Sequence, residues 1–107
     1  MINIEYEKHG NIEELNVNGH ADYAPSGKDI VCAAVSSIVY TLKIALEKAE
    51  QNKKALLLKC ELKEGCAVLI FNTLSAETSA IVNALIDGLK AISDSYPDYI
   101  RFSPCGA

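Results

Sequence analysis

The spacing of the apolar residues constrains the fold of this chain more than any other feature. Two long segments repeat apolar residues every three or four positions, which is typical of amphipathic helices. The first runs to about Glu50, and the second starts at Ser75 and ends where Pro97 disfavours helix. The other regular segments have the period-two alternation of strands or are short apolar runs, at residues 2–8, 15–19, 56–63 and 67–71.

The order of these segments predicts an α+β fold in two layers. Turn residues at 8–11 and 63–66 join the strands into two hairpins, so the order is β-β-α-β-β-α with an optional short strand over 99–102. Paired hairpins imply a mainly antiparallel sheet on which both helices pack. Residues 67–71 are apolar on both faces, which favours a central strand. A chain of 107 residues fits one domain, residues 1–107.

Each predicted helix has an apolar stripe for the core. The uncharged run from Ile30 to Leu42 is shorter than the ~20 residues that a membrane span needs, so we expect a core helix rather than a membrane anchor. The predicted stripes are Val31, Val35, Ile38, Leu42, Ala45 and Ala49 in the first helix, and Ile81, Leu85, Leu89 and Ile92 in the second.

Charge and composition restrict the partners and the compartment. The net charge is −4, whereas phosphate binding needs clustered Lys and Arg, so we expect no direct nucleic-acid ligand. The first residues, MINIEYEK, lack the profile of a signal peptide, which predicts a cytoplasmic protein. The four cysteines are then expected to be reduced thiols rather than disulfides.

Residues 19–36 combine a histidine, a loop and a cysteine at the start of a helix. His20 is expected at the end of the second strand. Pro25 and Gly27 interrupt the periodicity and predict a loop, in which Gly27 can adopt a positive φ. The helix can begin in two ways, with either Ser26 or Asp29 as its N-cap. Both place Cys32 in the first or second turn.

Cys32 and His20 are the candidate catalytic pair. Backbone N–H groups at a helix N-terminus favour a thiolate, and the same groups can hold an oxyanion. His20 would be the general base, since a modest loop closure brings it beside Cys32. The alternative is a small core residue at Cys32 and a loop histidine at His20. His9 lies in a turn, where we expect no catalytic role.

Other residues of this stretch are candidates for support. Asp22 and Asp29 are the candidates to orient the imidazole, although each also suits a structural task in a turn or cap. Ser36 lies one helical turn after Cys32 and can donate a hydrogen bond to the thiolate or bond back to its own helix. The loop suggests a further hypothesis, in which a docking peptide orders it and completes the pair.

A metal site is not expected. Cys60, Cys66 and Cys105 lack the close spacing of a zinc knuckle, and no glycine-rich phosphate loop is present. The sequence therefore predicts neither a metal nor another cofactor.

The motif GHA, a loop, and then GxDxVCAxxS resembles the ribosomal-processing cysteine protease family of Firmicutes and related bacteria. It reads here as Gly19-His20-Ala21 and Gly27 to Ser36, and the expected element order is also similar. The resemblance implies that Cys32 is the nucleophile and His20 its proton-transfer partner. It further implies removal of the N-terminal extension of a large-subunit ribosomal protein, after a hydrophobic motif that contains phenylalanine, by a homodimer.

Two other classes of function stay open at this point. A non-catalytic, ribosome-associated module could bind a peptide at a sheet edge, with Cys32 as a buried helix residue. A thiol-based regulator would need a resolving partner for Cys32, and no other cysteine has an obvious position for that role.

Overall fold

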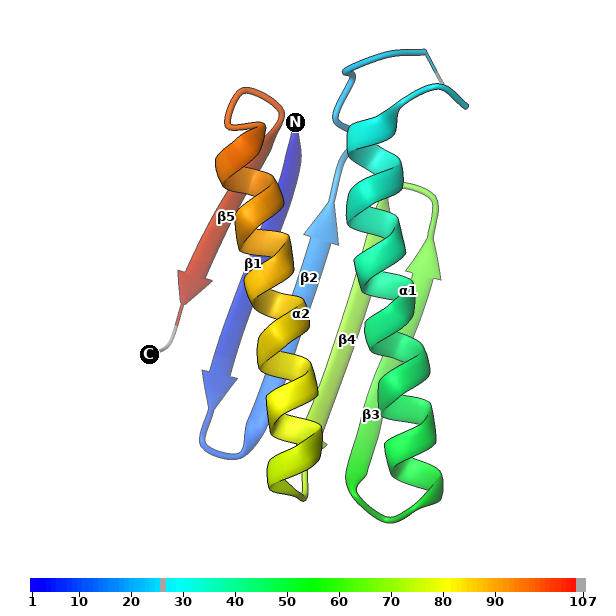
Figure 1. Cartoon of the computed structure of the whole chain (residues 1–107), viewed down its shortest axis with the longest axis vertical. Helices are drawn as coiled ribbons and strands as arrows, with labels where there is room; N and C mark the ends of the chain where they lie inside the picture. The colour runs from blue at the N-terminus through cyan, green and yellow to red at the C-terminus, as the bar shows by residue number, and fades with distance from the viewer. Residues whose placement is uncertain (26, 106–107) are drawn as a thin grey trace.

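The computed structural model describes residues 1–25 and 27–105 and contains one sheet with two helices (Figure 1). The expected order of elements is confirmed, and the optional last strand is present and longer than expected. The elements are β1 (Ile2–His9), β2 (Ile12–Asn18), α1 (Ile30–Gln51), β3 (Ala55–Lys63), β4 (Cys66–Thr73), α2 (Ala76–Ser95) and β5 (Ile100–Cys105).

The sheet has the strand order β3-β4-β2-β1-β5. All neighbouring strands are antiparallel except β1 and β5, which are parallel because α2 returns the chain before β5 begins. Both helices lie on the same face of the sheet, which completes two layers (Figure 1). The α+β, mainly antiparallel prediction is therefore confirmed, and β4 is an interior strand as its two apolar faces indicated.

Helix α1 is long and apolar enough to cross a membrane by length and composition alone. In this fold, its most apolar stripe packs into the core between the sheet and α2. The buried residues of that stripe are Val31, Val35, Val39, Leu42 and Leu46. The predicted stripe did not include Val39 and Leu46, which are buried. It included Ile38, Ala45 and Ala49, which are only partly buried.

The stripe predicted for α2 is rotated relative to the one that the structure buries. Ile81 is 49% exposed, and the buried residues are Thr78, Val82, Ile86, Leu89 and Ser93. Short hydroxyl side chains occupy core positions because they are bonded locally. The Ser93 hydroxyl donates to the Lys90 carbonyl at 2.7 Å, and Thr78 shares a hydrogen bond with Ser75, the expected N-cap.

A β-bulge interrupts the alternation that was expected along β3. The pairing of β3 with β4 shifts between Leu57 and Lys59, which leaves Leu58 unpaired. Leu56 and Leu58 are consequently exposed, while Leu57 packs against the core. The free N–H of Leu57 on this edge strand donates to the Glu50 carboxylate of α1 at 2.8 Å.

A polar network lies between the sheet and the start of α2. Glu13 is only 6% exposed, and its carboxyl group accepts a hydrogen bond from the Tyr6 hydroxyl. Thr73 contacts the other Glu13 oxygen at 3.5 Å and the Ser79 hydroxyl at 2.8 Å. Burial, and then the bond to Glu13, raises the pKa of Tyr6 well above its usual range. The network therefore joins β1, β2, β4 and α2.

Removing the Tyr6 hydroxyl should destabilise the fold. Tyr6→Phe leaves the buried Glu13 carboxyl group without its closest donor, so the free energy of unfolding should fall by about 1–3 kcal/mol. Tyr40→Phe removes a hydroxyl from a tyrosine that is 54% exposed and serves as the control. Urea unfolding measures both changes at constant m-value. Equal midpoints for the two variants would contradict this role for the network.

Candidate functional site

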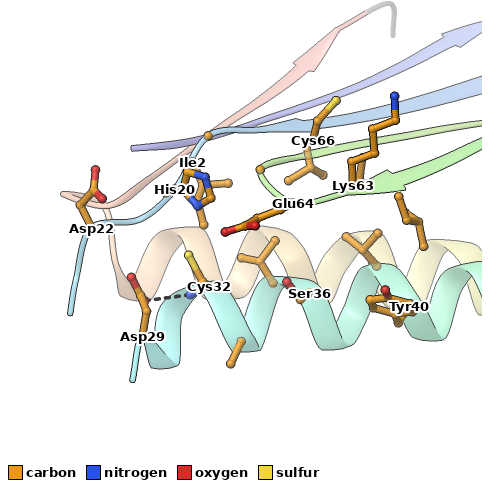
Figure 2. Close-up of a pocket in the computed structure, with 18 of the residues that line it drawn as sticks. Ile2, His20, Asp22, Asp29, Cys32, Ser36, Tyr40, Lys63, Glu64 and Cys66 are labelled. Carbon is orange, nitrogen blue, oxygen red and sulfur yellow. Dashed lines mark hydrogen bonds between the residues drawn. The ribbon is translucent and has the colours of Figure 1, made fainter. Parts of the chain in front are cut away.

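A cleft of about 770 Å³ lies between the first half of α1, the loop after β2 and the turn between β3 and β4 (Figure 2). It brings together every residue that the sequence singled out as a site residue. These residues are His20, Gly27, Asp29, Cys32 and Ser36.

Asp29 fixes where α1 begins and therefore where Cys32 lies. It is the N-cap, and its Oδ1 accepts hydrogen bonds from the N–H groups of Val31 and Cys32, each at 3.0 Å. Of the two starts that the sequence allowed, the structure has the one at Asp29, and Ser26 lies outside the described residues. Cys32 is consequently the third residue of α1, in its first turn.

A backbone contact places the candidate base beside the candidate nucleophile. The N–H of Ala21 donates to the Sγ of Cys32 at 3.3 Å, and Ala21 directly follows His20. Figure 2 shows the His20 ring and the Cys32 side chain facing each other at one end of the cleft. His20 lies two residues beyond the end of β2 rather than at its last residue. The Ala21 N–H and the N-terminal end of α1 therefore both lie next to the Cys32 Sγ.

In the described part of the chain, no hydrogen bond joins the His20 ring to Asp22 or Asp29, the two candidates to orient it. Asp29 uses its second oxygen to accept the N–H of Tyr23 at 3.1 Å. Backbone donation, mainly from Cys32, lowers the pKa of Asp29 despite an opposing effect of desolvation, so its carboxylate is committed to the helix cap and the loop. Asp22 is exposed with a φ of 57°.

The turn between β3 and β4 packs against the His20 ring through Gly65. Gly19 donates its N–H to the Gly65 carbonyl at 2.9 Å, and the His20 carbonyl accepts the Met1 nitrogen at 2.6 Å. A Cβ added to Gly65 would lie 2.7 Å from His20 Nε2, so only glycine leaves room for the ring at its present position. Sequence reasoning found this turn but not its contact with His20.

An aromatic cluster anchors the loop that follows His20. The ring of Tyr23 packs edge-on against Tyr96 and Tyr99, with centroid distances of 6.0 and 5.1 Å. Both partners belong to the connection between α2 and β5, which lies at the same end of the fold as the loop (Figure 1). The hypothesis that a docking peptide orders this loop stays a prediction.

The remaining candidates lie around the cleft. Ser36 is exposed one turn after Cys32, and Gly27 has a φ of 85°, the positive value that its position suggested. Figure 2 shows Cys66 directed away from Cys32. Among the side chains that the structure describes, those of residues 1–25 and 27–103, no group of three or more His, Cys, Asp or Glu is placed to hold a metal ion.

Substitution of Gly65 should displace the His20 ring. Gly65→Ala and Gly10→Ala both place a side chain at a positive φ, 73° and 63°, so each should cost about 1–2 kcal/mol of stability. Only the Gly65 variant meets the imidazole, because a Cβ at Gly10 has no neighbour within 4 Å. The ¹H–¹³C signals of the His20 ring should therefore shift in Gly65→Ala alone. An unchanged His20 signal in that variant would contradict the proposed contact between Gly65 and the His20 ring.

Residues 1–101 match the family model described as cysteine protease Prp. The ribosomal processing cysteine protease Prp of Mycoplasma pneumoniae is 33% identical over 102 residues, covering 95% of this chain and 93% of that protein. The protein of the same name from Mycoplasma genitalium is 35% identical over 88 residues, covering 80% and 82%.

Two solved structures have the same fold. The crystal structure of an essential ribosomal processing protease Prp from S. aureus with a covalently linked product peptide has a TM-score of 0.74 at 19% identity, covering 97% of this chain and 99% of that one. The complex of the S. aureus protease with a substrate peptide has a TM-score of 0.69 at 17% identity and the same coverage. The family match over residues 1–101, with two relatives that share about a third of the aligned residues, shows that the chain belongs to the cysteine protease Prp family.

Proposed function

We propose that this chain removes the N-terminal extension of a large-subunit ribosomal protein, with Cys32 as the nucleophile and His20 as the general base. The observation that carries the assignment is the hydrogen bond from the Ala21 N–H to the Cys32 Sγ, which brings the two residues together in one cleft. Membership of a cysteine protease family supplies the reaction class.

The residues account for both halves of peptide hydrolysis. In acylation, the Cys32 Sγ forms a bond to the scissile carbonyl carbon while His20 takes the thiol proton. The C–N bond then breaks, His20 returns the proton to the departing amine, and the N-terminal fragment stays on Sγ as a thioester. In deacylation, His20 takes a proton from water, whose oxygen attacks the thioester carbonyl. The C–S bond breaks, His20 returns the proton to the departing Sγ, and the free acid leaves.

The structure narrows the choice of oxyanion donor. The first-turn N–H groups of Val31, Cys32 and Ala33 all donate to Asp29, so they are engaged by the cap rather than free for an oxyanion as expected from the sequence. The Ala21 N–H instead points at the reacting sulfur. Once Sγ bonds to carbon, this N–H is positioned near the developing oxygen and is our proposed donor.

The family supports a peptide from a ribosomal protein as the substrate. Both relatives are named ribosomal processing cysteine proteases, and the S. aureus protease was crystallised with a covalently linked product peptide. The net charge of −4 suits encounter with a basic ribosomal protein. The resemblance further suggests a cut after a hydrophobic, phenylalanine-containing motif. No specific observation favours the non-catalytic binding module.

We propose in addition that the enzyme acts as a cytoplasmic homodimer. The family resemblance supports this assembly, and α2 exposes Ile81 at a position where a second copy could pack. Light scattering of the purified chain should give twice the monomer mass at working concentration. A monomer mass at that concentration would reject the dimer.

The catalytic assignment predicts how three variants process the extended ribosomal protein. Cys32→Ala should abolish cleavage and still bind the substrate, because it lacks only the nucleophile. His20→Ala should slow cleavage roughly 100-fold or more, since it lacks the general base. Cys60→Ala should cleave normally, because Cys60 is exposed and lies outside the cleft lining. Mass spectrometry of the ribosomal protein N-terminus measures each product.

Two results would reject this assignment. Unchanged cleavage by Cys32→Ala would show that another group is the nucleophile. An intact extension after incubation with the wild-type chain would reject the substrate.

A further inference from the structure

The cleft continues along α1 beyond the catalytic pair. Besides the polar residues near the catalytic pair and Lys63, its lining contains an apolar group with contributions from both α1 and the β3–β4 hairpin. The residues of this part are Val35, Val39, Tyr40, Leu62 and Ala67. Figure 2 shows Ser36 and Tyr40 following Cys32 along the helix. Catalysis at Cys32 does not explain why the cleft extends this far.

Tyr40 and Leu62 face this extension from its two sides. Val35 and Val39 are almost fully buried and form the floor, whereas Tyr40 is 54% exposed. Leu62 is partly buried and packs against the core from β3. A half-exposed aromatic ring above an apolar floor loses water when an apolar side chain packs on it. The chemistry of this part of the cleft therefore favours an apolar group.

The helix sets the distance from the reacting sulfur. Cys32, Ser36 and Tyr40 are spaced by four residues, so they lie on nearly the same face of α1. Eight residues of helix correspond to a rise of about 12 Å. An extended peptide advances about 3.3 Å per residue, so a peptide along α1 reaches Tyr40 three or four residues from the bond at Cys32.

We propose that Tyr40 and Leu62 form a subsite for one apolar substrate side chain, three or four residues from the scissile bond. This inference rests on the proposed function. The occupant is the substrate itself because the surface is continuous with the cleft that contains Cys32, which the scissile bond must enter. The subsite selects substrates by a residue remote from the cut, in addition to any selection at the cut itself.

Helix α1 offers a matched control for this inference. Ile44 lies one turn beyond Tyr40 and is 53% exposed, nearly the same fraction as Tyr40. It is apolar and on the same helix, but it does not line the cleft. A loss caused by general changes on the surface of α1 should appear in Ile44→Ala as well as in Tyr40→Ala.

The experiment measures kcat/KM for synthetic peptides that span the cut. Leu and Ala are placed in turn at each of five positions on both sides. The wild type should prefer Leu over Ala by about tenfold at one position, three or four residues from the cut. Tyr40→Ala should lose that preference and keep those at the other positions. Tyr40→Phe, which retains the ring, should keep the preference for Leu at that position, and Ile44→Ala should match the wild type.

Several outcomes would overturn the subsite. They are an unchanged preference profile in Tyr40→Ala, a loss confined to the residues next to the cut, and an equal loss in Ile44→Ala. A wild-type enzyme that cleaves none of the peptides and leaves the extended ribosomal protein intact rejects the proposed function instead. Cleavage with an unaltered profile rejects the subsite alone.

Discussion

The carboxylate of Asp29 is the contact on which the geometry of the cleft depends. One of its oxygens accepts the N–H groups of Val31 and Cys32, which fixes the first turn of α1 and the position of the thiol. The other accepts the N–H of Tyr23, which ties the loop after His20 to the same point. The Asp29 side chain thus fixes the loop that follows His20 relative to the first turn of α1, which contains Cys32. The N–H groups of Val31, Cys32 and Ala33 also donate to Asp29, and for this reason we propose the Ala21 N–H as the oxyanion donor.

The strand order explains why the β3–β4 turn lines the cleft together with α1 and the loop after β2. Because β4 pairs with β2 and Cys66 pairs with Asn18, the β3–β4 turn lies beside the residues that follow β2. Gly65 therefore meets the His20 ring, and the same hairpin contributes Leu62 farther along the cleft. The long helix carries Cys32, the proposed nucleophile, at its start and Tyr40 two turns later, so one rigid element spaces the thiol and the proposed subsite.

Local chemistry made much of this predictable from the sequence. The turn and cap residues predict the hairpins, the positive φ of Gly27 and a start of α1 at Ser26 or Asp29, because each depends on neighbours in the chain. The structure has the start at Asp29. The contact between Gly65 and His20 and the packing of Tyr23 depend instead on which strands are adjacent. The alternation of apolar and polar residues alone does not determine that order. The sequence did not predict the β-bulge at Leu58, where hydrogen bonds with other elements override the simple periodicity. It also did not predict the rotated stripe of α2, where hydrogen bonds within the helix do so.

The most direct test of the catalytic account is the identity of the atom that carries the cleaved fragment. Wild-type enzyme mixed with the extended ribosomal protein and quenched rapidly in acid should contain a covalent adduct. Its added mass should equal the N-terminal fragment less one water, and peptide mapping should locate it on Cys32. Cleavage that proceeds with the adduct on Cys60 or Cys66 would contradict the assignment of Cys32 as the nucleophile.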